Sequence, residues 1–325
     1  MKTFVPLIEK EIKSAIKIHG FPNLYDGMEY AIGTGGKRLR PILCLAICKS
    51  LGEDFKKAIP FATAIELVHN FTLIHDDIED GDHIRRGKPT VWKKYGIAHA
   101  INIGDGMIFR AYEELEKSRN ILQIEKVLDL IHIFNNSIMK VIEGQNMEFN
   151  FRKKDSIKIK EYEEMATKKA GVLFGLSLAG AAIISNADGK IIQSLSKYGE
   201  KIGLVFQIRD DILNLKGKED RYGKEIGGDI KEGKKTLIVI HCLKKCDSIE
   251  REGLLNILNK ERKNVSSDDI EFSMKLIEKY RSIDFAEKYA EKMFKEANRH
   301  IKNIGNKNLM ELFEEFSTFV IKRDY

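Results

Sequence analysis

The sequence predicts an all-α protein, and three observations support that fold class. All five prolines lie within the first 89 residues, so no proline interrupts Thr90–Tyr325, and proline is the residue that most strongly breaks helices. Apolar residues recur every three or four positions in several long segments, as in helices with one buried face. No run of alternating apolar and polar residues bounded by turns predicts a sheet. We expect roughly ten or more helices, forming a single domain over residues 1–325.

The segments that carry the helical pattern follow one another along the whole chain. The first is Phe61–His75, and Val127–Met139 and Ile270–Tyr280 repeat its apolar spacing. Ala170–Ile184 is mainly apolar and rich in small residues, which indicates a closely packed buried helix rather than a membrane span. Clusters of glycine, proline and charge predict breaks at Gly33–Gly36, Gly81–Pro89, Ser185–Gly189 and Lys216–Lys235.

Charge and cysteine content narrow the class of protein. The formal net charge is +6, which fits anionic small substrates or a lysine-rich surface, and no basic tail points to nucleic acid. The first residues include acids and no long apolar run, so we expect no signal peptide, no membrane span and a cytoplasmic location. The four cysteines form two pairs with helical spacing, which favours packing over a zinc site beside His241; they are Cys44, Cys48, Cys242 and Cys246.

Two acidic clusters each follow an apolar helical run. Asp76-Asp77-Ile78-Glu79-Asp80 places four acids in five residues, with Asp76 and Asp80 one turn apart on one face. Such crowding requires a cation, and Mg²⁺ binds a few carboxylates together with phosphate oxygens. Asp210-Asp211 ends a second run, Ile202–Ile208. The two clusters are predicted to face each other across a cavity in a helical bundle, although each alone could be an exposed acidic helix end.

Two basic segments accompany the acidic clusters. Gly35–Pro41 offers glycines and three cations but is no Walker loop, because neither Ser nor Thr follows Lys37. Arg85-Arg86-Gly87-Lys88 comes almost directly after the first acidic cluster. Metal-binding carboxylates beside guanidinium groups are what a diphosphate needs. The alternation of acid and base therefore predicts a diphosphate site.

Taken together, these segments resemble the trans-isoprenyl diphosphate synthases, the family of farnesyl and geranylgeranyl diphosphate synthases. The segments GGKRLRP, ELVHNFTLIHDDIED, RRGKPT, FQIRDDIL and GKEIGGDIKEGKKT occur in that family's order between about residues 33 and 237. The C-terminal quarter carries no such motif. The resemblance implies the isoprenoid synthase fold, a single large helical bundle around a deep central cavity. It also implies condensation of isopentenyl diphosphate with an allylic diphosphate, and a homodimer.

The resemblance also implies roles for individual residues. It implies Mg²⁺ as the cofactor, three ions per site, with ligands at Asp76, Asp77, Asp80 and Asp210. The allylic diphosphate would contact Arg85, Lys168 and Lys234. The isopentenyl diphosphate would contact Lys37, Arg40, His69 and Arg86. Gln207 resembles the family's glutamine near the metals, and Lys224 and Asp229 resemble residues that close over the diphosphate.

Three departures from the family pattern bear on the predicted function. Asn214 stands where a third aspartate is usual, which predicts weaker metal binding, and Lys169 stands where threonine is usual. Asp76-x-x-Glu79-Asp80 also fits squalene and phytoene synthases, but GGKRLRP and RRGKPT argue against them. A terpene cyclase would carry glutamate where Lys218 stands. A non-catalytic subunit of a heteromeric synthase is disfavoured, because the acids of the first cluster are present.

The length of the product is predicted from the residues just before the first acidic cluster. The fifth residue before Asp76 is Phe71 and the fourth is Thr72. In the family, one aromatic at the fifth position with a small neighbour resembles producers of geranylgeranyl diphosphate (C20). We therefore expect a C20 product, with farnesyl (C15) and geranylfarnesyl (C25) diphosphate as alternatives.

Overall fold

The computed structural model describes residues 2–17, 20–216 and 226–321, and these residues form helices almost throughout. The all-α fold class is confirmed. The helices of the first half are η1 Lys2–Phe4, α1 Val5–Ile16, α2 Tyr25–Gly33, α3 Leu39–Ser50, η2 Phe55–Ala58, α4 Ile59–Asp80, α5 Val91–Tyr95, α6 Ile97–Glu116, η3 Lys117–Asn120 and α7 Ile124–Arg152. The helices of the second half are α8 Ile159–Ala166, the π-helical turn η4 Thr167–Gly171, α9 Val172–Ile184, α10 Gly189–Lys216, α12 Gly228–Lys231, α13 Leu237–Lys245, α14 Ser248–Leu258, η5 Arg262–Asn264, α15 Ser267–Lys279, α16 Ser282–Ile301 and α17 Lys307–Ile321.

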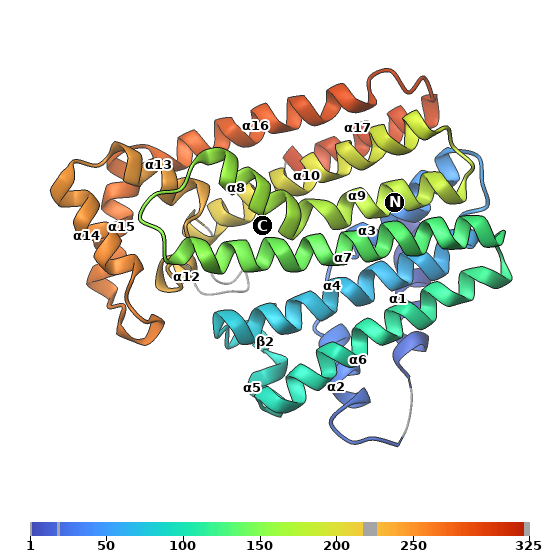
Figure 1. Cartoon of the computed structure of the whole chain (residues 1–325), viewed down its shortest axis with the longest axis horizontal. Coiled ribbons are helices and arrows are strands. Elements are labelled where there is room, and N and C mark those ends of the chain that lie inside the picture. The colour runs from blue at the N-terminus through green and yellow to red at the C-terminus, as the bar shows by residue number, and fades with distance from the viewer. Residues whose placement is uncertain (1, 18–19, 217–225, 322–325) are drawn as a thin grey trace.

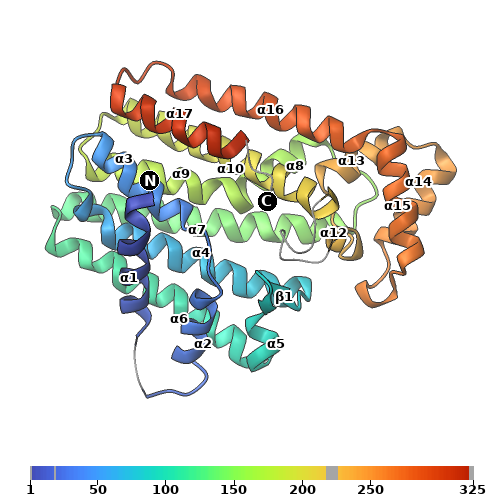
Figure 2. The same cartoon turned by 180° about the vertical axis from the view of Figure 1, so that it is seen from behind.

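The long helices lie side by side along the long axis of the molecule. Helices α4, α7, α9 and α10 form the middle of the bundle, with α6 and α16 on opposite sides (Figure 1). The smaller helices α13, α14 and α15 gather at one end, which is also seen from behind in Figure 2. The four segments with helical periodicity fall within α4, α7, α15 and the run from η4 to α9.

Helix α9 is the most deeply buried element of the bundle. All of its residues except Ile183 are buried. The helical run Ile159–Ile184 is apolar and long enough to cross a membrane, but most of its apolar window is buried inside the bundle. Glycines bring η4 and α10 into backbone contact, because a Cβ on Gly203 would lie 2.3 Å from the Cα of Gly171. This contact fixes the height of α10 against η4, and both carry residues of the site described below.

The predicted breaks coincide with the ends of helices. Helix α2 ends at Gly33, α9 ends at Ile184 and α10 begins at Gly189. The break at Gly81–Pro89 contains a short hairpin, in which β1 Ile84–Arg85 pairs antiparallel with β2 Lys88–Pro89. Its two turn residues, Arg86 and Gly87, have φ of +54° and +74°, which is typical of the tight type I′ turn. Only part of the Lys216–Lys235 break is described, and Lys224 lies outside the described residues.

Candidate functional site

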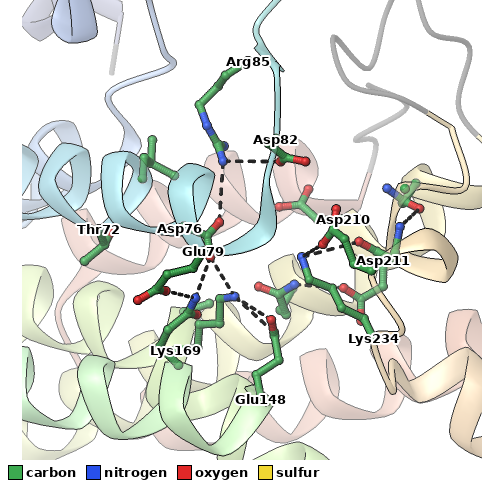
Figure 3. Close-up of a pocket in the computed structure, with 18 of the residues that line it drawn as sticks. Thr72, Asp76, Glu79, Asp82, Arg85, Glu148, Lys169, Asp210, Asp211 and Lys234 are labelled. Carbon is green, nitrogen blue, oxygen red and sulfur yellow. Dashed lines mark hydrogen bonds and ion pairs between the residues drawn. The ribbon is translucent and has the colours of Figure 1, made fainter. Parts of the chain in front are cut away.

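A cavity of about 1880 Å³ lies within the bundle and is lined by both acidic clusters and both basic segments. Asp76 and Asp210 line the same cavity, so the two clusters share one hollow (Figure 3). Of the predicted site residues, those that line this cavity are Lys37, Arg40, His69, Phe71, Thr72, Asp76, Arg85, Arg86, Gln207, Asp210 and Lys234. Most of the predicted site residues therefore lie in the wall of one cavity.

The first acidic cluster occupies the last turn of α4, where negative charge is unfavourable. The carbonyl end of a helix dipole repels acids, and α4 ends at Asp80 with Gly81 in the left-handed conformation. Cations offset this cost. Asp76 Oδ1 accepts from Lys169 Nζ at 3.0 Å, and Asp76 Oδ2 lies 3.5 Å from Arg85 Nη2. We call Asp76, Asp80, Asp210 and the cations that contact Asp76 and Asp80 the acidic end of the cavity.

Asp77 and Asp80 are turned away from the open space, unlike Asp76. Arg85 Nε donates to Asp77 Oδ1 at 2.7 Å. Asp80 Oδ1 accepts from Arg152 Nη2 at 2.5 Å, and its Oδ2 accepts from Lys234 Nζ at 2.8 Å. Neither aspartate is among the described residues that line the cavity. Their predicted role as magnesium ligands stays a prediction, and for Asp80 it requires the carboxylate to exchange these cations for a metal.

Lys168, predicted to grip a diphosphate, points outward. Its Nζ lies 3.0 Å from Glu143 and 3.2 Å from Glu164, and among the described residues it does not line the cavity. Lys169 enters the cavity in its place. Both lysines lie in the π-helical turn η4, so the pattern of cavity-facing positions cannot be extrapolated from regular α-helical spacing. The sequence-based assignment to Lys168 is therefore corrected to its neighbour.

Lys169 is a buried cation between two carboxylates. Its Nζ lies 3.0 Å from Asp76 Oδ1 and 3.0 Å from Glu148 Oε1 (Figure 3). Burial alone would lower the pKa of Lys169, but Asp76 and Glu148 raise it above its usual value. The ammonium group therefore keeps its proton and can stabilise an anion that enters the cavity.

Both aspartates of the second acidic cluster line the cavity from α10, and they differ in burial. Asp210 is half-buried. Asp211 is buried, and its carboxylate accepts hydrogen bonds from Tyr162 and Gln207. Burial and the nearby Asp229 carboxylate raise the pKa of Asp211 well above its usual value, although the hydrogen bonds from Tyr162 and Gln207 act in the opposite direction. Asp211 is thus held by neutral donors, whereas Asp76 and Asp80 contact cations.

Asn214 has a structural partner in addition to its place beside the cavity. Its Oδ1 accepts from the backbone N–H of Asp229 at 3.2 Å, and its backbone oxygen accepts from Gly227 at 2.8 Å. Asn214 thereby fastens the start of α12 to α10. The same loop carries Lys234, whose Nζ contacts Asp80, Asp229 and Glu232.

The two basic segments are tied together by backbone acceptors. Arg86 Nη1 donates to the carbonyl of Gly35, and Lys88 Nζ donates to the carbonyl of Gly33 at 3.0 Å. Tyr30 Oη donates to the carbonyl of Pro89 at 2.7 Å. The Gly33–Arg40 segment and the hairpin therefore form one wall, which carries Lys37, Arg40 and Arg86. Together with His69 these residues make what we call the basic end of the cavity.

Cations at the basic end lie close enough together to disfavour one another's positive charge. Burial, Arg38 and Arg85 lower the pKa of Arg86 to about 10. Burial, Arg40 and Arg86 hold the pKa of His69 well below its usual value, so His69 is neutral at pH 7. A buried cluster whose positive charge is already disfavoured gains most from an anion. The basic end is therefore suited to bind a diphosphate directly.

The strained start of α3 is held by a buried ion-pair network. Arg38 has φ of +48° and its side chain is fully buried. Its guanidinium donates to Glu9 at 2.7 Å, to Glu66 at 2.9 Å and to the carbonyl of Ile32 at 2.9 Å. These three acceptors hold the backbone between Lys37 and Arg40 in its shape.

The donor set at the acidic end fits Mg²⁺ better than a softer ion. Carboxylate oxygens of Asp76 and Asp210 reach the cavity, and Mg²⁺ needs only one or two carboxylates when phosphates complete its shell. Among the described residues, no three His, Cys, Asp or Glu side chains form a metal-binding group by themselves. The four cysteines are free thiols, three of them buried, as expected for packing.

Several residues of the site were missed by sequence reasoning. Gln145, Glu148 and Arg152 line one side of α7 and contact Asp76 or Asp80 or their partners. Their spacing of three and four places them on one face of α7, which was a usable signal. Arg262 contacts Asp82 and Glu232 from the C-terminal part of the chain, at 3.0 and 3.1 Å. No motif marked that residue.

The wall before the first acidic cluster contains an aromatic pair. The rings of Phe71 and His75 are 4.7 Å apart, and both line the cavity. Thr72 also lines it, and its hydroxyl donates to the carbonyl of His69 at 2.8 Å. A Cβ on Gly104 of α6 would lie 2.4 Å from the His75 ring. The absence of a side chain at Gly104 therefore leaves room for the His75 ring against α6.

Comparison with known proteins gives a consistent result. The polyprenyl synthetase family model matches residues 21–277. The chain is similar to the geranylgeranyl pyrophosphate synthase of Geoglobus acetivorans, with 35% identity over 100% of this chain and 98% of that protein. It is 33% identical to the geranylfarnesyl diphosphate synthase of Aeropyrum pernix, over 80% and 81% of the two chains. The crystal structure of geranylgeranyl pyrophosphate synthetase from Pyrococcus horikoshii superposes with a TM-score of 0.89 at 36% identity, covering 99% and 97%.

Proposed function

Because the chain belongs to the polyprenyl synthetase family, we propose that it condenses isopentenyl diphosphate head to tail with allylic diphosphates. The allylic substrates would be dimethylallyl, geranyl and farnesyl diphosphate, and the product geranylgeranyl diphosphate. The observation that best supports this proposal is that one cavity has both an acidic end and a basic end. Each end suits a diphosphate, one through metal ions and the other directly.

The acidic end is proposed to take the allylic diphosphate. Magnesium bound to Asp76 and Asp210 would act there as a Lewis acid. Lys169, Lys234 and Arg85 bring positive charge to the same place. As the allylic C–O bond breaks, negative charge grows on the diphosphate, and fixed cations stabilise it most in a site that excludes water.

The basic end is proposed to hold isopentenyl diphosphate. Lys37, Arg40 and Arg86 supply charged donors, and neutral His69 can donate one hydrogen bond without adding charge. The alkene then attacks the allylic carbon, a new C–C bond forms, and a proton leaves the neighbouring carbon. The released diphosphate accepts that proton, so no side-chain base is required.

The direct test is an assay of the purified chain alone. Labelled isopentenyl diphosphate, Mg²⁺ and each allylic primer should give a labelled prenyl diphosphate, and EDTA should abolish it. Sizing the lipids identifies the product. Absence of product with every primer would contradict the proposal and would favour a non-catalytic subunit.

The C20 product length is proposed from Phe71 and the relatives named geranylgeranyl synthases. Phe71→Ala removes the ring that lines the cavity before Asp76, so products should lengthen to C25 or beyond. Phe272→Ala, on the surface of α15, is the matched control. An unchanged product from Phe71→Ala would contradict this reading, and a C25 product from the unaltered chain would favour geranylfarnesyl synthesis.

A homodimer is proposed through α6 and α7. These neighbouring helices expose large apolar side chains, a group that includes Ile97, Ile101, Phe109, Leu128, Met139 and Ile142. Phe109 is 70% exposed, and contiguous apolar patches of this kind mark interfaces. Light scattering should give twice the chain mass, and Phe109→Glu should shift it towards the monomer. A monomeric unaltered chain would contradict the proposal. The single domain over 1–325 and the cytoplasmic location stay predictions.

A further inference from the structure

Asp211 uses both carboxylate oxygens on partners within the chain. Tyr162 Oη donates to its Oδ2 at 2.7 Å, and Gln207 Nε2 donates to its Oδ1 at 2.8 Å. Tyr162 on α8 and Asp211 on α10 are 1% and 5% exposed. A buried acid satisfied in this way is fixed in place. Asp211 and its neighbour Asp210 both line the cavity.

This arrangement sets the orientation of the Gln207 amide. Gln207 and Asp211 both line the cavity, and Asp211 is the more deeply buried of the two. An amide carries its NH₂ and its carbonyl oxygen on opposite sides of one plane. Because the NH₂ donates to Asp211, the carbonyl oxygen lies on the opposite side of the amide group. The other orientation would face two acceptor oxygens towards each other and leave a buried acceptor unsatisfied.

The position of Tyr162 follows from the same helical run that supplies Lys169. Helix α8 carries Tyr162 and continues directly into η4, which carries Lys169. One rigid segment thus supports Asp211 from one side and contacts Asp76 through Lys169. The orientation of Gln207 is therefore tied to the wall that holds the first acidic cluster.

We propose that Asp211 and Tyr162 are positioning residues, which hold Gln207 so that its carbonyl oxygen faces the allylic carbon. A carbonyl oxygen stabilises the positive charge that grows on this carbon as diphosphate leaves, whereas an amide NH₂ would destabilise it. This role rests on the proposed prenyl transfer, and it separates Asp211 from its metal-binding neighbour.

The test is a double-mutant cycle between Asp211 and Gln207. Asp211→Asn can present an NH₂ group to Gln207, which favours the reversed amide, and Gln207→Leu removes the carbonyl. Each change should lower kcat about 10²-fold, which is the typical loss when one preorganised dipole is removed from an active site. The double variant should lose no more than the larger single loss, because both act through one group. The Mg²⁺ concentration for half-maximal rate should stay within about twofold.

Two outcomes would overturn the role. Independent effects would multiply to about 10⁴-fold in the double variant. A raised Mg²⁺ requirement in Asp211→Asn would make Asp211 a metal ligand instead. If the unaltered chain makes no prenyl product, the proposed function is wrong. If it makes the product but the two kcat losses multiply in the double variant, only the positioning role is wrong.

Tyr162→Phe keeps the test decisive if Asp211→Asn does not fold. It removes one hydrogen bond to Asp211 and should lower kcat about fivefold to tenfold, the usual value of such a bond, with both KM values unchanged. Tyr289→Phe is the matched control, since Tyr289 on α16 donates to Glu163, and its kcat should not change. Equal kcat for Tyr162→Phe and the unaltered chain would overturn the proposal.

Discussion

The acidic and basic ends of the cavity are stabilised in opposite ways. At the acidic end, the carboxylates of Asp76 and Asp80 already contact Lys169, Arg152 and Lys234. At the basic end, cations crowd together, and the pKa of Arg86 is lowered to about 10 by burial and by Arg38 and Arg85. At the acidic end, where carboxylates and cations are paired, a metal cation and a diphosphate can enter together. At the basic end, where cations crowd together, a diphosphate can bind without a metal. The allylic diphosphate should therefore require metal ions for binding, whereas isopentenyl diphosphate should not.

The largest effect is expected at Asp76, whose carboxylate reaches the cavity at the acidic end. Asp76→Ala should lower kcat about 10³-fold or more, because a metal contact and the partner of Lys169 are lost together. Steady-state assays over a range of Mg²⁺ would measure it, and the thermal midpoint should change little. A loss below tenfold would mean that the acidic end does not hold the metal.

The next effect separates the two adjacent lysines. Lys169→Ala should lower kcat about 10²-fold, because its ammonium group faces the departing diphosphate. Lys168→Ala is the matched control and should stay within about twofold, since its partners Glu143 and Glu164 are exposed and such pairs contribute little. Equal losses in the two variants would break the assignment of Lys169 to the acidic end.

A smaller and more selective effect is expected at the basic end. Arg86→Ala should raise KM for isopentenyl diphosphate about 10- to 100-fold, the range for a charge-assisted hydrogen bond, with KM for the allylic substrate unchanged. Calorimetry in EDTA should show that the unaltered chain binds isopentenyl diphosphate, while an unreactive allylic diphosphate analogue requires Mg²⁺. Identical metal requirements for both ligands would contradict the contrast between the two ends.

The smallest effect is expected at Asn214, next to the second acidic pair. Asn214→Asp keeps an acceptor for the Asp229 N–H and adds negative charge near Asp210. The Mg²⁺ concentration for half-maximal rate should fall about twofold to threefold, because the added carboxylate attracts the ion while it stays bound to the Asp229 N–H rather than to the metal. A rise in that concentration, or no change, would show that this position does not influence the metals.

Sequence reasoning predicted the acidic clusters and the basic wall well, because short motifs carry them. It placed Asp76, Asp210, Arg86 and His69 at one cavity. It selected Lys168 instead of Lys169, since an α-helical pattern cannot reveal a π-helical turn. It assigned Asp77 and Asp80 the same metal-binding role as Asp76, which stays a prediction; spacing alone could not show that Asp77 pairs with Arg85 and Asp80 with Arg152.

Other contacts were beyond sequence reasoning because they join distant parts of the chain. Arg262 approaches Asp82 across almost 200 positions of sequence, and Tyr162 meets Asp211 through packing of α8 on α10. Neither contact follows from local periodicity. They arise from the docking of whole helices, which depends on the glycine contacts between η4 and α10.

The acceptor that Glu9 offers to Arg38 has a practical consequence for shortened versions of the protein. Helix α1 is remote in sequence from the acidic clusters and is an obvious target for trimming before crystallisation or immobilisation. Trimming it would leave a buried guanidinium short of one acceptor beside a backbone already held at positive φ. A protein shortened in this way should bind isopentenyl diphosphate more weakly, because the backbone between Lys37 and Arg40 loses part of its support. Expression vectors should therefore retain the first helix.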